Sequence, residues 1–257
     1  MIYLLGFIYQ GGNLMEYSGA SAYNDDKFFE NYIARRNREE SPNNIIEKPI
    51  LLELIGDVKG IKVLDLGCGD AKFGVELLQK GCITYDGVEG SENMVREAIK
   101  NLKGTEGEVH LTSIENWSFH KEKYDLVVSR LALHYLAELK DIFQKIFNSL
   151  TDNGKFIFTV QHPVLTSSIK SATASSSKSD WIVDDYFNSG KRVEPWIDKQ
   201  VVKYHRTFEE YYQLLKLAGF KIDDVREGTP KVEKFSSENE YKRRMRIPLF
   251  LIFACEK

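Results

Sequence analysis

The sequence has few cysteines, and their spacing fits neither a disulfide framework nor a zinc site. Cys68, Cys82 and Cys255 are odd in number and include no C-x-x-C pair among 257 residues. This usage excludes a small disulfide-stabilised protein. It is typical of a reducing compartment, so we expect a cytoplasmic protein without a bound metal.

Long hydrophobic runs are also missing. The longest run near the N-terminus spans residues 2–9, is interrupted by Gly6, and is too short to cross a bilayer. It lacks the basic segment and cleavage site of a signal peptide. We therefore expect no membrane partner. We also expect residues 1–14 to be a dispensable extension that precedes a start at Met15.

The chain has no excess of charge of either sign. Lys and Arg total 35, Asp and Glu total 38, and the formal net charge is −3. A basic footprint for nucleic acid is therefore absent, and we expect no nucleic-acid partner. The length, with 42% hydrophobic residues, suffices for a sizeable core in one or two domains.

Strands and helices alternate through the middle of the chain. Hydrophobic runs predict strands at 61–66, 83–89, 108–111, 124–129 and 155–160, and helical periodicity predicts helices at 45–55, 72–80, 91–102 and 136–150. This order predicts an α/β fold, with a doubly wound, mostly parallel sheet covered on both faces. A capping-box sequence at 207–210 begins a later helix, and strands follow at 220–225 and 247–255.

These patterns divide the chain into four segments. Residues 1–44 form an N-terminal extension and helical lid, 45–161 form the core, 162–206 form an inserted cap, and 207–257 return to the core. Seven serines among the fifteen residues 166–180 predict a flexible loop within the cap. The charged stretch 231–246 is predicted to be a solvated surface loop.

The motif with the clearest chemistry is VLDLGCGDA, residues 63–71. A buried strand runs directly into Gly67-Cys68-Gly69 and then into a helix. Glycines let the backbone turn sharply and approach a ligand, and the amides at a helix start suit a polar group. Glu89 ends the next strand, twenty residues after Gly69. A carboxylate at that place accepts hydrogen bonds from two ribose hydroxyls.

The third glycine of a dinucleotide-binding fingerprint is missing. The pattern G-x-G-x-x-G needs glycine where Lys72 stands, and the next glycine is Gly74. Asp65 would also repel a pyrophosphate, whereas it would attract a cationic ligand. An NAD-dependent oxidoreductase is therefore a less favoured alternative.

Together these residues resemble motifs I and II of the class I S-adenosylmethionine-dependent methyltransferases. The similar segments are VLDLGCGDA (63–71), YDGVEGSENMV (85–95), SIENWSF (113–119), YDLVVSRLALHYL (124–136) and LTDNGKFIFTV (150–160). In addition, HPVLTS (162–167) with KYHRT (203–207) resembles a bacterial subgroup that acts on small molecules. The resemblance implies a Rossmann-like seven-stranded sheet with a cap inserted after the fifth strand.

The resemblance also implies which residues hold the cofactor, S-adenosyl-L-methionine. Asp65 would orient the glycine loop and the methionyl amine, and Glu89 would hold the ribose hydroxyls. Many family members have an Asp where Ser113 stands, to accept from the adenine amino group. The other residues implied to contact the cofactor are Gly67, Cys68, Gly69, Gly90, Ser91, Met94, Ile114, Glu115, Ser129 and Arg130.

The implied reaction is in-line transfer of a methyl group to an oxygen, nitrogen or carbon of a small molecule. After the fourth strand, the chain lacks the Asn/Asp-Pro-Pro-Tyr/Phe pattern of adenine-N6 and glutamine-N5 methyltransferases. It also lacks the Pro-Cys pair of cytosine-C5 enzymes. A tRNA or rRNA methyltransferase, and a cofactor-binding module without catalysis, remain alternatives.

Two histidines are candidate catalytic bases. His162 directly follows the fifth strand, at the edge where open α/β sheets bind ligands, and His205 lies where the cap rejoins the core. Imidazole titrates near neutral pH, so either is able to take a proton from the acceptor. We predict that at least one ring points into the space beyond the cofactor's methyl group. For His134, packing beside Tyr135 is the favoured role.

Aromatic and basic side chains outside the core have two interpretations each. Those at 17–36 either fold over the cofactor, with an arginine on the methionine carboxylate, or lie on a helix packed against the core. Those at 181–204 either line a substrate pocket or fill a small cap. The run Arg243, Arg244 and Arg246 either contacts a phosphate or lies in solvent.

Overall fold

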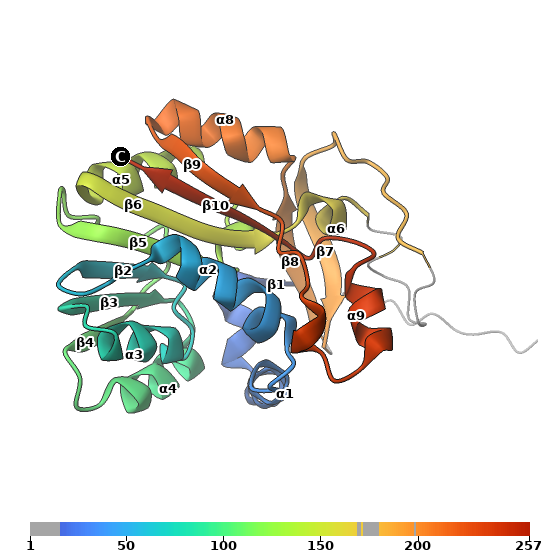
Figure 1. Cartoon of the computed structure of the whole chain (residues 1–257), viewed down its shortest axis with the longest axis horizontal. Coiled ribbons are helices and arrows are strands. Elements are labelled where there is room, and N and C mark those ends of the chain that lie inside the picture. Colours follow the sequence, from blue (N-terminus) through green and yellow to red (C-terminus); the bar gives the residue numbers. More distant parts are fainter. Residues whose placement is uncertain (1–15, 169–170, 172–179, 198) are drawn as a thin grey trace, which may run out of the picture.

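Seven strands form a central sheet in the computed structural model, which describes residues 16–168, 171, 180–197 and 199–257 (Figure 1). The strand order is β4-β3-β2-β5-β6-β10-β9, and β10 pairs antiparallel with both of its neighbours. The doubly wound, mostly parallel sheet is therefore confirmed. The strands are β2 (Lys62–Leu66), β3 (Thr84–Glu89), β4 (Gly107–Leu111), β5 (Tyr124–Arg130), β6 (Leu150–Gln161), β9 (Lys221–Arg226) and β10 (Phe250–Glu256).

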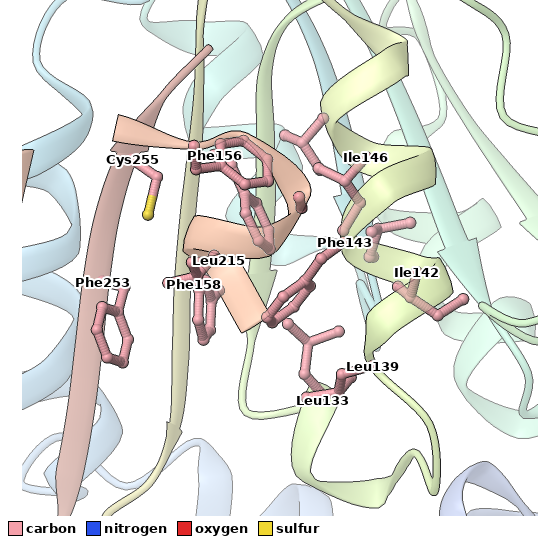
Figure 2. Packing of buried hydrophobic residues seen from close by; sticks show 14 of the residues in the cluster. Leu133, Leu139, Ile142, Phe143, Ile146, Phe156, Phe158, Leu215, Phe253 and Cys255 are labelled. Carbon is pink, nitrogen blue, oxygen red and sulfur yellow. The ribbon is translucent and has the colours of Figure 1, made fainter. Parts of the chain in front are cut away.

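Helices cover both faces of this sheet, because side chains alternate between the faces along each strand. Leu64 of β2 belongs to the core beneath α5 and α8, whereas Val63 belongs to the core beneath α2, α3 and α4. Figure 2 shows the first core, where Phe143 of α5 lies near Phe156 and Phe158 of β6. The helices are α2 (Lys48–Ile55), α3 (Lys72–Gln79), α4 (Glu92–Leu102), α5 (Lys140–Ser149) and α8 (Phe208–Ala218).

The predicted helix caps are present. Ser91 caps α4 by accepting from the backbone N–H of Met94. Thr207 and Glu210 form a reciprocal capping box at α8. Gly219 ends α8 with a left-handed φ of 102°.

A second, three-stranded sheet joins the N-terminal segment to the insert. Its order is β1-β8-β7, with β1 (Glu16–Ser18) parallel to β8 (Lys199–His205) and β7 (Gly190–Trp196) antiparallel to β8. The hairpin of β7 and β8 was not predicted. This hairpin and the N-terminal helices form one layer, although the N-terminal segment and the insert lie far apart in the sequence. The further elements here are η1 (Gly19–Asn24), α1 (Asp26–Arg36) and α6 (Pro163–Ser167).

Some expectations fall outside the described residues. Residues 1–14 are not described, and neither are 169–170 and 172–179, which form most of the expected serine-rich loop. Within the described part of the chain, no helix has the length and apolar character needed to span a bilayer.

The prediction of a solvated loop at 231–246 is wrong. This stretch contains η4 (Val232–Lys234) and α9 (Glu238–Arg244). Ser237 caps α9 by accepting from the backbone N–H of Glu240. Before α9, the N–H of Ser236 donates to Glu40, at 3.3 Å, so this segment packs on the loop that follows α1.

Three boundaries also differ from the predictions. The helix expected from residue 136 begins at Lys140, after the short helix η3 (Leu133–Tyr135). The helix expected from residue 45 begins with a π-helical turn, η2 (Asn43–Glu47). The strand expected from Lys155 begins at Leu150, and its pairing with β5 jumps from Leu150 to Lys155.

Candidate active site

A cavity of about 860 Å³ lies at the carboxyl edge of the central sheet. Its walls include Asp65 of β2, Glu89 of β3, Arg130 of β5 and Gln161 at the end of β6. The layer built on the second sheet adds further walls, with aromatic rings from η1, α1 and β7. The rings from that layer are Tyr23, Tyr32 and Trp196.

Ten of the twelve residues implied to hold the cofactor line this cavity. Ser91 and Ser129 do not. The Ser91 hydroxyl bonds Asn24 at 2.9 Å, and the Ser129 hydroxyl donates to the Leu66 carbonyl at 2.7 Å. Both serines therefore lie behind the wall. The ten that line it are Asp65, Gly67, Cys68, Gly69, Glu89, Gly90, Met94, Ile114, Glu115 and Arg130.

The glycine loop has no room for a side chain at its first position. Gly67 has a φ of +78°, and a Cβ there would lie 2.3 Å from the Cβ of Ala132. The N–H groups of Gly67 and Cys68 both donate to the Val88 carbonyl, at 2.8 and 3.1 Å. The loop is thus held against the end of β3, and its open backbone forms a cradle in the cavity wall.

Glu89 ties that loop to the next helix. Its carboxylate accepts from the backbone N–H of Gly69 at 3.0 Å and from that of Ser91 at 2.8 Å. Burial raises the pKa of Glu89, while the backbone N–H donors oppose that rise. A buried carboxylate with two backbone donors is fixed in place, and Glu89 lines the cavity.

Asp65 has an acceptor atom without a protein partner. Its Oδ2 accepts from the Tyr85 hydroxyl at 2.8 Å, whereas its Oδ1 is buried and unpartnered within the described residues. Burial raises the pKa of Asp65 to about 6. A buried, unpaired carboxylate oxygen is costly unless a cation or a donor reaches it. The chemistry of this atom therefore fits a ligand with an ammonium or sulfonium group.

Gly74, the next glycine after the loop, has a packing role. A Cβ at this position would lie 2.1 Å from the Tyr85 ring. Gly74 therefore makes room for the ring of Tyr85, whose hydroxyl donates to Asp65. This packing explains why a glycine stands here although it is not part of a dinucleotide fingerprint.

The two histidines predicted as bases do not line the cavity. His162 accepts from the Val164 N–H at 3.2 Å, and its Nε2 lies 3.0 Å from Glu227. His205 bonds the Thr166 hydroxyl at 2.7 Å and the Tyr186 carbonyl at 2.8 Å. Since both nitrogens of each ring have protein partners, these histidines are placed as structural groups. The expectation that one of them points into the cavity is not met.

His134 lies in the cavity wall instead. Its side chain is buried, stacks on Tyr135 with ring centroids 4.4 Å apart, and has no described partner for Nδ1. Burial lowers the pKa of His134 well below 6.5, and the charges of Lys203 and Arg206 act in the same direction. The ring is therefore neutral near pH 7. The sequence analysis favoured packing for His134, and only the fold shows that this packing position borders the cavity.

Arginines also line the cavity, and one of them is neutralised. Arg130 makes two hydrogen bonds to the fully buried Glu47, which also accepts from the Thr159 hydroxyl at 3.0 Å. Of the N-terminal side chains considered for a lid, Tyr23, Tyr32, Arg35 and Arg36 line the cavity, whereas Tyr17 and Phe28 do not.

Comparisons with known proteins show the family of this chain. A family model for a methyltransferase domain matches residues 57–241. The chain belongs to this methyltransferase family. An uncharacterised protein of Haemophilus influenzae is 30% identical over 247 residues, which cover 92% of this chain and 97% of that protein.

Two solved structures are similar over most of the methyltransferase. One is a proposed S-adenosylmethionine-dependent methyltransferase from Listeria monocytogenes, with 33% identity, a TM-score of 0.75, and coverage of 81% of this chain and 95% of that chain. The other is an S-adenosylmethionine-dependent methyltransferase from Mesorhizobium loti, with 26% identity, a TM-score of 0.76, and coverage of 84% and 98%. The protein is therefore a class I S-adenosylmethionine-dependent methyltransferase with a Rossmann-like fold.

The residues present fit S-adenosylmethionine. The unpartnered Oδ1 of Asp65 suits the cofactor's cationic groups, and the cradle at Gly67 admits it close to the backbone. Of the arginine run for which the sequence left a phosphate contact and solvent exposure open, Arg244 lines the same cavity, whereas Arg243 and Arg246 do not.

Proposed function

We propose that this methyltransferase acts on a small molecule bound in the part of its cavity beyond the cofactor. The observation that carries the proposal is the reach of the cavity along the sheet edge. Most residues matched to the cofactor lie at or after the ends of β2, β3 and β4, with Met94 on α4 and Arg130 at the end of β5. The cavity continues past them to Leu131 after β5, Gln161 at the end of β6 and Phe250 at the start of β10. A volume of about 860 Å³ lies within the range of pockets that bury small ligands.

In this proposal, the chain's own residues bind, orient and shield the reactants. S-adenosylmethionine supplies an activated methyl group on a cationic sulfur. Asp65 provides the opposing charge, and Glu89 holds the ribose. The aromatic walls from Tyr23, Tyr32 and Trp196 exclude water from the site. Alignment of donor and acceptor supplies most of the acceleration, because it replaces an encounter between two free molecules.

We assign the contact with the acceptor's nucleophile to His134, whose ring lies in the cavity wall. It is neutral near pH 7, so it accepts a hydrogen bond without adding charge beside a sulfonium.

The cytoplasmic location expected from the cysteine usage stays a prediction. All three cysteines are buried and free.

The full chain is expected to bind S-adenosylmethionine and S-adenosylhomocysteine, and not NAD. Asp65 would repel a pyrophosphate, and Lys72 stands where the dinucleotide fingerprint needs its third glycine. Titration calorimetry with each of the three ligands checks this expectation. Saturable binding of NAD with no heat from S-adenosylhomocysteine would overturn the proposed function.

Affinity for S-adenosylmethionine is expected to fall as the pH drops below about 6. The buried carboxyl of Asp65 has its pKa raised to about 6, so in more acidic solution it is protonated before the cofactor arrives. Binding of a cation must then displace that proton, which costs up to about ten-fold in affinity per pH unit. Calorimetry across that range measures the inflection. Asp65→Asn should bind more weakly at neutral pH and lose the inflection, and a flat wild-type profile contradicts the role of Asp65.

A further inference from the structure

We propose that the methyl acceptor carries a carboxylate or phosphate group, which Arg38 and Arg244 hold at the end of the cavity away from the adenine site. This inference rests on the proposed function and adds the chemical class of the acceptor.

The cavity wall contains four arginines without a close carboxylate partner, whereas its own carboxylates, Asp65, Asp70, Glu89 and Glu115, lie in or after β2, β3 and β4. Arg35, Arg36 and Arg38 line it, and none makes an ion pair with a described residue. Arg244 also lines it, and its nearest carboxylate oxygen, on Glu240, is 3.9 Å away. That same oxygen is bonded by Arg243 at 2.7 Å. A concave surface concentrates the field of such charges, so the site attracts an anion.

Arg38 and Arg244 act on each other, although they belong to distant segments. Burial lowers the pKa of Arg244, and the charges of Arg243 and Arg38 lower it further. Arg38 lies in the loop after α1, and Arg244 ends α9. Just before α9, the N–H of Ser236 donates to Glu40 of that loop, which brings the two segments together. Two cations at one place in a cavity wall repel each other, and an anion between them removes that repulsion.

Arg36 acts on the glycine loop, since its charge, after that of the paired Arg130, lowers the pKa of the buried Asp65. We assign it to the cofactor's own carboxylate. Arg38 and Arg244 lie elsewhere along the wall. Pro42 and Asn43, which follow Arg38 in the chain, line the cavity, as do Leu249 and Phe250, which follow Arg244.

The strand order separates this end of the cavity from the adenine end. Leu249 and Phe250 lie at the start of β10, whereas Glu89 ends β3, and β2, β5 and β6 stand between those strands. Figure 1 shows α9 at the same end of the central sheet as β7 and β8. A cofactor bound over the ends of β2 and β3 is therefore separated from Arg38 and Arg244, and these two arginines are available to bind the acceptor.

Both guanidinium groups have donors available. Arg38 uses its Nε to donate to the Arg35 carbonyl, at 3.3 Å, which leaves its two terminal nitrogens for a ligand. The Arg244 side chain is 22% exposed, so it is partly fixed by its surroundings and still reaches the cavity. Paired guanidinium groups bind carboxylate and phosphate through two parallel hydrogen bonds each.

Calorimetry tests the site without knowledge of the acceptor. Malonate and inorganic phosphate are titrated separately into the full chain saturated with S-adenosylhomocysteine, with chloride balancing the ionic strength. We expect saturable binding of at least one anion. The anion that binds more tightly indicates whether the acceptor carries a carboxylate or a phosphate. Arg38→Gln and Arg244→Gln should each weaken that binding about ten-fold or more. Arg38→Lys and Arg244→Lys keep the charge but lose the paired donors of the guanidinium group. Their affinity for the anion should lie between that of the Gln variants and that of the wild type.

Lys242→Gln is the matched control. Lys242 lies on α9, is ion-paired with Glu238, and does not line the cavity. It should leave anion binding unchanged, and none of the variants should change the affinity for S-adenosylhomocysteine. Absence of saturable binding of both anions overturns the inference, as does an equal loss in Lys242→Gln. Equal loss of S-adenosylhomocysteine affinity in the Gln variants would assign the two arginines to the cofactor. Failure of S-adenosylhomocysteine to bind the wild type would instead refute the proposed function.

Discussion

Glu47→Ala is expected to lower the free energy of unfolding by about 3–5 kcal/mol, the typical cost of breaking a buried ion pair. Glu47 is fully buried and accepts from Arg130 and from the Thr159 hydroxyl. Its removal leaves the Arg130 side chain, only 8% exposed, without a counter-charge in a low-dielectric wall. The penalty arises from that uncompensated charge more than from the lost attraction.

Urea unfolding of the cofactor-free protein measures this loss. Glu238→Ala serves as the control, because its pair with Lys242 is exposed, and exposed pairs contribute about 0–1 kcal/mol. Replacing both partners, Glu47→Leu with Arg130→Met, should recover much of the stability, since no buried charge remains. A Glu47→Ala loss as small as that of the control would show that Arg130 finds water or another partner.

The cofactor half of the site was predictable because its chemistry is local. Asp65 and Gly67 follow one another on a strand and turn, and Glu89 ends the next strand. Each position has a sequence signal of its own: a buried run, a glycine pair and a spacing of twenty residues. The capping box at Thr207 was predictable for the same reason, because four adjacent residues decide it.

The acceptor half depends on contacts between distant segments. His162 was expected at the cavity because it follows a strand, but its partner Glu227 lies 65 residues away. The hairpin of β7 and β8 was missed because one of its strands, β8, pairs with a strand from the N-terminus, and Pro195 weakens the strand pattern of β7. For Arg244 the sequence left a phosphate contact and solvent exposure open, because the charged stretch around it gives no sign of which side faces the cavity. In these cases, the position of the residue depends on a partner far away in the sequence, and the local sequence pattern does not predict that contact.

Glu89→Gln is expected to reduce the affinity for S-adenosylhomocysteine about ten- to a hundred-fold, because hydrogen bonds to a charged acceptor contribute about 1.5–3 kcal/mol. The carboxylate accepts from the N–H groups of Gly69 and Ser91 and would also accept from the ribose hydroxyls. An amide has one acceptor oxygen, and its NH₂ group would face one of those backbone donors.

The same variant separates binding from folding. Because burial raises the pKa of Glu89, its ionised form costs the cofactor-free fold stability at neutral pH, and that cost grows as the pH rises through the raised pKa. A neutral Gln removes this cost while it loses charged hydrogen bonds, so the unfolding midpoint without cofactor should change little. Calorimetry and thermal unfolding are measured on the same sample. Glu92→Gln, an exposed neighbour on α4, is the control and should bind as the wild type does. An unchanged dissociation constant in Glu89→Gln would show that this carboxylate does not hold the ribose.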